Sequence, residues 1–286
     1  MTHFVRTETI GNFLIVTLDR PAVLNSLHAP ACHELSMIWD DFLEDDNLWL
    51  AIVTGTGDQA FCAGHDLVED FHAPMPKSGW AGLSHRTEFH KPLIAAVNGL
   101  ALGGGWEIAL EADIIVSHPR ARFGLPEPKV GFAALGGGAR MLPKRMPYHV
   151  AMGLMLTGDT LSADEALHFG LVNEISPEDG LMETAMAWAE KLKKCAPLAL
   201  RATKRIARRS MAPVHTLDDL YSLICFQNHP IHRKGSRPLQ KDDPPSGLAG
   251  KPACPPPPPS HSAASRSEAT RTWLFFWTVQ HFLFPT

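Results

Sequence analysis

The sequence predicts an α/β fold, because short apolar runs of strand length alternate along it with helix-like stretches. The 286 residues are 45% hydrophobic and 20% charged, which is enough apolar material for one large domain or two modest ones. The apolar runs cover residues 13–18, 50–53, 93–97 and 114–116, and the helix-like stretches cover residues 31–43, 106–111, 163–169 and 181–192.

Capping signals support the helix expected at residues 163–169. Ser162 and Glu165 form the S-x-x-E pattern of a capping box, and Gly170 stands where this helix should end. Residues 192–211 mix Lys and Arg with Leu, Ala and Ile, which is typical of an amphipathic helix or helix pair. We expect the basic face of this segment to be solvated.

Composition excludes several classes of protein. With 26 basic and 30 acidic residues the formal net charge is −4, so a basic-patch nucleic-acid binder is not expected. The N-terminus lacks the pattern of a signal peptide, and the apolar stretch 273–284 is shorter than the roughly 20 residues of a membrane span. We therefore expect a cytoplasmic protein with no membrane partner. Five cysteines without C-x-x-C spacing argue against a disulfide framework and against a structural zinc site.

The densest signal for chemistry lies in residues 91–116, where an apolar run leads into Gly103, Gly104 and Gly105 and then into a helix-like stretch. Successive glycines allow a sharp turn that leaves backbone N–H groups at a positive helix N-terminus, where an anion can bind. Neither the G-x-G-x-x-G pattern nor the P-loop pattern is present.

Two carboxylates accompany this turn. Glu107 follows Gly105 by two residues, and Glu127 lies in the segment ARFGLPEPKVGF. Each could be structural, as a helix-start acid or as part of a solvated turn. Together, beside an anion-binding turn, they suit proton transfer next to a carbonyl that becomes an enolate.

Six ordered motifs make the chain resemble the crotonase (enoyl-CoA hydratase/isomerase) superfamily over roughly residues 5–227. They are RPAVLNSL (20–27), AFCAGHDL (60–67), KPLIAAVNGLALGGGWEIAL (91–110), FGLPEPKVGF (123–132), GGGARMLPK (136–144) and LTGDTLSADEALHFGLVNEI (156–175). The resemblance implies an α/β spiral of ββα units with C-terminal helices, assembled as a homotrimer or hexamer. Residues 1–195 would form the spiral core and residues 196–227 the helical trimerisation region.

The resemblance also implies roles for individual residues. The backbone N–H groups of His65 and Gly104 would form an oxyanion hole for the thioester oxygen, while Glu107 and Glu127 would act as acid and base. Further substrate or coenzyme A contacts would come from Ala22, Leu24, Ala63, Gly64, His65, Asp66, Leu67, Val68, Gly103 and Pro126. Because the His65 position acts through its backbone, we expect its side chain to be a pocket-wall residue.

The two glutamates favour an enoyl-CoA hydratase, which adds water across the 2,3 double bond of an enoyl-CoA thioester. Coenzyme A is part of the substrate, and no metal or redox cofactor is expected. Three alternatives stay open: a carnitinyl-CoA dehydratase, an enoyl-CoA isomerase, and a non-catalytic crotonase-fold binding protein.

The composition changes near residue 227, because 11 of the 24 prolines fall in residues 228–286. This tail holds five consecutive prolines, which predicts disorder. We also expect it to be a frame-shifted ending. Residues 232–251, back-translated with allowed codons and reread from the third base of the first codon, permit PEGLPAFAERRPPQWPGR followed by a stop, which resembles the usual family ending. A genuine Pro-rich extension is the alternative, and the coding DNA distinguishes the two.

Overall fold

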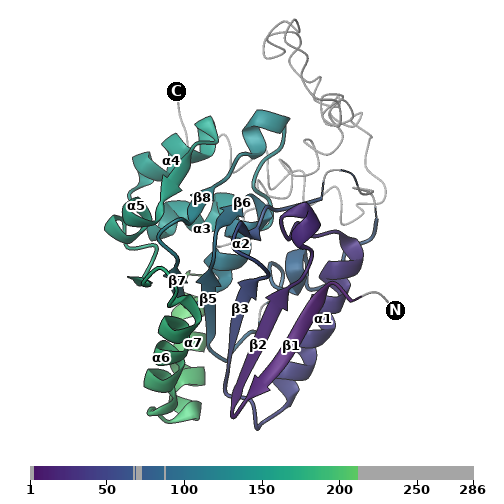
Figure 1. Cartoon of the computed structure of the whole chain (residues 1–286), viewed down its shortest axis with the longest axis vertical. Coiled ribbons are helices and arrows are strands. Elements are labelled where there is room, and N and C mark those ends of the chain that lie inside the picture. Colours follow the sequence, from purple (N-terminus) through teal and green to yellow (C-terminus); the bar gives the residue numbers. More distant parts are fainter. Residues whose placement is uncertain (1–2, 67, 69–72, 87, 212–286) are drawn as a thin grey trace, which may run out of the picture. The chain divides into compact units, whose positions relative to one another are not determined.

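The computed structural model of the chain describes residues 3–66, 68, 73–86 and 88–211, and its elements are arranged in an α/β fold built on two sheets (Figure 1). One sheet has the strand order β1-β2-β3-β5-β7-β10, and the other has the order β4-β6-β8-β9. The strands are β1 (Val5–Ile10), β2 (Phe13–Leu18), β3 (Leu50–Gly55), β4 (Ala60–Cys62), β5 (Leu93–Val97), β6 (Leu100–Leu102), β7 (Ile114–Ser117), β8 (Arg122–Gly124), β9 (Thr160–Ser162) and β10 (Glu174–Ile175).

Helices connect and cover these strands. The α-helices are α1 (Ala29–Glu44), α2 (Gly104–Glu111), α3 (Gly138–Arg145), α4 (Tyr148–Thr157), α5 (Ala163–His168), α6 (Leu181–Lys193) and α7 (Pro197–Met211). Short 3-10 helices in the described part of the chain are η1 (Pro21–Val23), η2 (Trp80–Gly82) and η3 (Glu127–Val130). The predicted capping box is present at α5, where the Ser162 hydroxyl accepts from the Glu165 N–H and the Glu165 carboxylate accepts from the Ser162 N–H.

The chain forms a spiral because it alternates between the two sheets. β3, β5 and β7 pair in parallel in the first sheet, and the strands that follow each of them, β4, β6 and β8, pair in parallel in the second. Each turn of the chain therefore adds one strand to each sheet. The spiral architecture expected from the sequence is confirmed, and it brings the start of α2, directly after β6, beside the end of β4.

The central strands β2, β3, β5 and β7 of the six-stranded sheet are buried on both faces, which explains their continuous apolar runs, whereas the edge strand β1 is mostly exposed. Side chains along β3 alternate between two cores: Leu50 and Ile52 pack with α6, whereas Ala51 and Val53 pack into the larger core that contains α1 and α2. The sheet thus packs, through the larger core, against the helix that the glycine-rich turn opens.

The orientation of α7 differs from the sequence-based expectation. Lys204 is buried, with Nζ bonded to Asp113 Oδ2 at 2.6 Å, and Arg208 is half-buried and paired with Glu111. Leu198 and Ile206, by contrast, are 76% and 70% exposed. The basic face is therefore not simply solvated, because the buried Glu111 and the exposed Asp113 supply partners for its cations.

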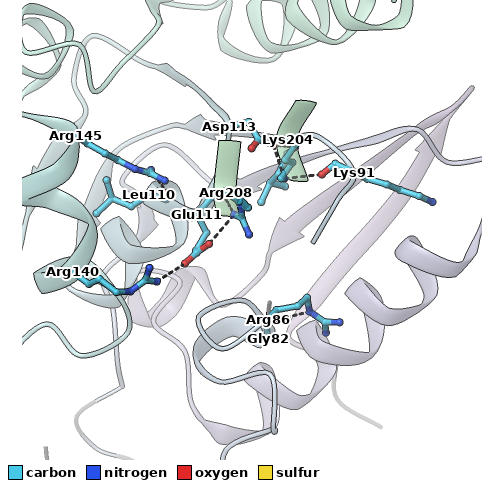
Figure 2. A network of polar contacts seen from close by, with 11 residues as sticks. Gly82, Arg86, Lys91, Leu110, Glu111, Asp113, Arg140, Arg145, Lys204 and Arg208 are labelled. Carbon is cyan, nitrogen blue, oxygen red and sulfur yellow. Dashed lines mark hydrogen bonds and ion pairs between the residues drawn. The ribbon is translucent and has the colours of Figure 1, made fainter. Parts of the chain in front are cut away.

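This contact fastens α7 to the end of α2 (Figure 2). Arg208 donates to both the carbonyl and the carboxylate of Glu111 at 2.7 and 2.8 Å, and Arg140 of α3 lies 3.7 Å from the other carboxylate oxygen. Arg145 donates to the Leu110 carbonyl. Three guanidinium groups thus surround the C-terminus of α2, where cations complement the helix dipole.

Some expectations lie outside the described residues. These are the coenzyme A contact of Leu67, the second half of the trimerisation region (212–227) and the whole tail (228–286). The boundary expected after residue 195 falls in the connection between α6 and α7, and it stays a prediction. No helix in the described part of the chain combines the length and apolar character needed to cross a membrane.

Candidate active site

The turn between β6 and α2 requires glycines because its backbone lies too close to neighbouring residues to leave room for a Cβ atom. Gly103 has φ 54°, a left-handed value that favours glycine, and it precedes the first residue of α2. A Cβ on Gly105 would lie 1.9 Å from the Cys62 carbonyl oxygen. The first turn of α2 is therefore pressed against the end of β4.

The two predicted oxyanion donors are brought together at this point. A Cβ on Gly64 would lie 3.2 Å from the Gly104 nitrogen, so the residue preceding His65 approaches the Gly104 amide closely. Leu27 forms a parallel bridge with His65 by donating to the Gly64 carbonyl and accepting from the Asp66 amide, both at 2.8 Å. Because successive peptide groups of a strand point to opposite sides, the His65 N–H is directed away from Leu27. The Gly104 N–H, at the first position of α2, has no acceptor within the helix.

Glu107 lies on the first turn of α2 and is only 4% exposed. Its Oε1 accepts a hydrogen bond from the Gly138 amide at 2.9 Å, and its Oε2 lies 2.3 Å from where a Cβ on Gly136 would be. Gly138 is the first residue of α3, so the N-terminus of a second helix faces this carboxylate. The first residues of the motif GGGARMLPK thus pack against the Glu107 carboxylate.

Glu127 reaches the same turn from η3, directly after the half-buried Pro126. Its Oε1 lies 3.2 Å from where a Cβ on Gly103 would be, and its Oε2 is buried and accepts no hydrogen bond within the described part of the chain. Burying a carboxylate oxygen without a hydrogen-bond donor costs free energy. Such an atom commonly binds a ligand or a water molecule.

Burial raises the pKa of both carboxyl groups. The pKa of Glu107 rises from 4.5 to about 7, because desolvation and the nearby Glu127 charge outweigh the hydrogen bond from Gly138. The pKa of Glu127 is also raised by desolvation. Two neighbouring carboxyl groups with raised pKa values, that of Glu107 near 7, can supply one protonated and one ionised carboxyl group, as general acid–base catalysis needs.

The loop of residues 20–27 is fixed beside β4. Leu24 and Asn25 have φ values of 54° and 56°, and the Asn25 amide donates to the Ala60 carbonyl at 2.8 Å. The Leu24 carbonyl accepts from the Ala63 amide at 3.0 Å, while Ala22 is exposed. The loop thus lies next to the segment that carries His65, and its contact with coenzyme A stays a prediction.

Asp66 has a structural partner that the sequence did not indicate. Its carboxylate pairs with Arg20 at 2.9 Å, and both side chains are largely buried. The ion pair joins the loop of residues 20–27 to the segment that carries His65. Val68 is 96% exposed. The predicted substrate contacts of Asp66 and Val68 are untested, and the Asp66 carboxylate is already engaged.

Sequence reasoning missed Trp80. Its indole N–H donates to the Gly104 carbonyl at 2.9 Å, and its ring stacks on the His65 imidazole. The only local signal was the pair Gly79 and Gly82 around it, since both have positive φ and mark a constrained turn. His65 is half-buried, and burial lowers its pKa, which agrees with a packed side chain rather than a charged one.

Comparison with known proteins assigns the family. The family model described as enoyl-CoA hydratase/isomerase matches residues 8–234. The chain belongs to this family. It is 38% identical to a carnitinyl-CoA dehydratase of Proteus mirabilis (strain HI4320) over 213 residues, which cover 73% of this chain and 81% of the relative. It is 39% identical to an (E)-benzylidenesuccinyl-CoA hydratase of Thauera aromatica over 209 residues, covering 71% and 81% of the two chains.

Solved structures agree with this assignment to the crotonase fold. A carnitinyl-CoA dehydratase from Mycobacterium avium 104 superposes with a TM-score of 0.75 at 33% identity, covering 84% of this chain and 99% of that one. An enoyl-CoA hydratase from Mycobacterium marinum gives a TM-score of 0.70 at 39% identity, covering 79% and 89%. The resemblance inferred from the motifs is confirmed, and the chain is a crotonase-family enzyme.

Proposed function

We propose that this crotonase-family enzyme is an enoyl-CoA hydratase, which adds water across the 2,3 double bond of an enoyl-CoA thioester. The observation that supports the proposal is that the carboxyl groups of the buried Glu107 and the half-buried Glu127 lie beside the turn that carries the Gly104 amide, close to His65. Proton transfer and oxyanion stabilisation are the two demands of this reaction.

In the proposed mechanism the thioester oxygen accepts hydrogen bonds from the His65 and Gly104 amides. The ionised glutamate takes a proton from water as the water oxygen bonds to C3, and the double-bond electrons move toward the thioester to give an enolate. The protonated glutamate then delivers its proton to C2. Water is consumed, and the two carboxyl groups have exchanged protonation states. Either glutamate can take either role in this scheme. Because only water and protons move, the reaction needs neither a metal nor a redox cofactor.

The reverse reaction defines a second candidate. Relatives 38–40% identical to this chain are named carnitinyl-CoA dehydratase, and dehydration uses the same carboxyl pair in the opposite direction. An isomerase would move a proton between carbons without incorporating water, and a non-catalytic binding protein would catalyse neither isomerisation nor hydration.

We also propose a homotrimer or hexamer, as expected from the resemblance. Light scattering of the purified chain tests this proposal.

A substrate panel tests the function. Crotonyl-CoA and (E)-benzylidenesuccinyl-CoA are assayed for loss of enone absorbance, and carnitinyl-CoA for its appearance. We expect hydration of at least one enoyl thioester. Faster turnover of carnitinyl-CoA would favour the second candidate. Binding of acyl-CoA without turnover of any substrate would contradict both.

Variants of the two glutamates test the mechanism. Glu107→Gln and Glu127→Gln should each reduce turnover by about 100-fold or more, while acyl-CoA binding is retained. Glu190→Gln on α6 is the matched control, because this glutamate is exposed and pairs only weakly with Lys193 at 3.5 Å. Near-parental turnover in both active-site variants would refute the hydratase mechanism.

A further inference from the structure

Trp80 contacts both residues whose amides form the proposed oxyanion hole. Its Nε1–H donates to the Gly104 carbonyl oxygen at 2.9 Å, and its ring stacks on the His65 imidazole with centroids 5.3 Å apart and planes at 21°. The ring also lies so close to Gly104 that a Cβ there would come within 2.5 Å of it. One side chain from a third segment thus touches both halves of the site.

The turn that carries Trp80 is itself held firmly against α1. Ala81 has φ 51°, and its carbonyl accepts a hydrogen bond from the Trp39 indole at 3.0 Å. A Cβ on Gly82 would lie 2.7 Å from the Ser36 backbone, so this residue packs directly on the helix. The Trp80 amide donates to the Ser84 hydroxyl at 2.8 Å. The backbone of the turn that carries Trp80 is therefore held by contacts with α1 and Ser84, which do not involve His65 or Gly104.

We propose that Trp80 is a positioning residue that fixes the relative placement of the His65 and Gly104 amides. This inference rests on the proposed function. His65 follows β4 and Gly104 opens α2, and an oxyanion hole works only when both donors are held within about 0.5 Å of their productive positions. Gly104 has no side chain to restrict its backbone, so contact with the Trp80 ring limits its conformational freedom. Stacking fixes the His65 side chain and, through its Cα, the adjoining amide.

The direction of the indole N–H distinguishes this role from that of an apolar wall. The Gly104 carbonyl is the acceptor that a helix offers to the amide four residues later, so the bond from Trp80 is additional to the helix ladder. A wall for the acyl chain would need only the ring surface. The N–H adds a directional hydrogen bond that restrains Gly104, the first residue of α2.

The test compares Trp80→Phe with a matched control, Trp188→Phe. Trp188 lies on α6 and also donates its indole N–H, to Glu174 Oε2 at 2.8 Å, but it packs in the other core. Each variant loses one indole hydrogen bond and keeps an aromatic ring. We measure kcat and KM with the best enoyl-CoA of the panel. We also measure the absorbance shift of bound 4-dimethylaminocinnamoyl-CoA, whose conjugated carbonyl reports hydrogen bonding in the oxyanion hole.

Trp80→Phe should reduce kcat roughly tenfold with little change in KM, the size expected for one well-placed hydrogen bond. It should also diminish the red shift of the bound chromophore, whereas Trp188→Phe should leave both unchanged. His65→Ala removes the stacking partner and keeps the backbone N–H, so it should cause a smaller loss of the same two signals. Its effect should be non-additive with that of Trp80→Phe.

The outcomes separate the two proposals. If the parental chain turns over an enoyl-CoA and Trp80→Phe, folded by circular dichroism, matches it in kcat and red shift, the positioning role is wrong and the proposed function stands. If Trp80→Phe does not fold, His65→Ala decides: parental kcat and red shift there would overturn the inference. If the parental chain neither turns over nor red-shifts any acyl-CoA, the proposed function fails and the inference fails with it.

Discussion

Replacing Glu107 by Gln should stabilise the fold at alkaline pH while it reduces turnover. The side chain is 4% exposed, and its pKa is raised from 4.5 to about 7, chiefly by burial. The folded state therefore binds this proton more tightly than the unfolded chain does. Stabilisation from the proton is fully present below pH 4.5 and is lost as pH rises through 7.

The size of the effect follows from the same values. A pKa raised from 4.5 to about 7 means that the ionised carboxylate disfavours folding by about 3 kcal/mol. Glutamine has the same shape and no charge, and its Oε1 can still accept from the Gly138 amide. Its NH₂ group cannot accept from Gly136, which reduces the gain. We expect the free energy of unfolding to rise by about 1–3 kcal/mol at about pH 8 and to stay nearly unchanged near pH 4.5.

Urea denaturation followed by circular dichroism at both pH values measures this difference. Glu111→Gln is the matched control, because Glu111 lies one turn further along α2 and is similarly buried. Its carboxylate pairs with Arg208 at 2.8 Å, so the same substitution there should lower the free energy of unfolding by about 1–3 kcal/mol.

The reasoning is refuted if Glu107→Gln is no more stable than the parental chain at about pH 8 while both variants unfold in two states. It is also refuted if the difference between Glu107→Gln and the parental chain is the same at both pH values, because a burial effect on ionisation must change with pH.

Further predictions concern glycines and pH. Gly105→Ala should prevent stable folding, since its Cβ would lie 1.9 Å from the Cys62 carbonyl oxygen, whereas Gly153→Ala, in open space on α4, should raise the free energy of unfolding by up to about 1 kcal/mol. Thermal unfolding of both variants checks this, and a well-folded Gly105→Ala would contradict the close approach. The pH profile of kcat/KM should be bell-shaped with one limb near pH 7, because Glu107 has a pKa of about 7 and the reaction needs one ionised and one protonated carboxyl group. Glu127→Gln should lose one limb in its residual activity, and a flat profile across this range would exclude the pair as acid and base.

Sequence patterns were most informative where a segment's environment is uniform along its length. Residues 93–97 form one apolar run because β5 is buried on both faces of the sheet, and the predicted strand matches it. The short strands β4, β6, β8 and β9 have three residues each and were not predicted. Three residues contain no usable periodicity, and such strands are defined by partners far away in the chain.

The same distinction holds at the candidate active site. Glu107 and Gly104 stand in one continuous motif, which made them visible in the sequence. Trp80 and the pair of Arg20 with Asp66 depend on contacts between segments, and no local pattern records them. The orientation of α7 was misjudged for a related reason: an amphipathic pattern shows that two faces differ, but it does not show which face finds partners.

The attachment of α7 has a consequence for the order in which the chain can fold. Glu111 and Asp113 meet Arg208 and Lys204 across 97 and 91 residues of sequence. Until Arg208 arrives, compaction around the end of α2 would bury the Glu111 carboxylate without its α7 partner, which is costly, whereas the exposed Asp113 would lack only its partner Lys204. Helix α2 should therefore acquire its protected backbone amides late, together with α7, and pulsed hydrogen exchange during refolding should show the two helices gaining protection in the same phase. A chain emerging from the ribosome should therefore complete the candidate active site only after residue 208 has been added.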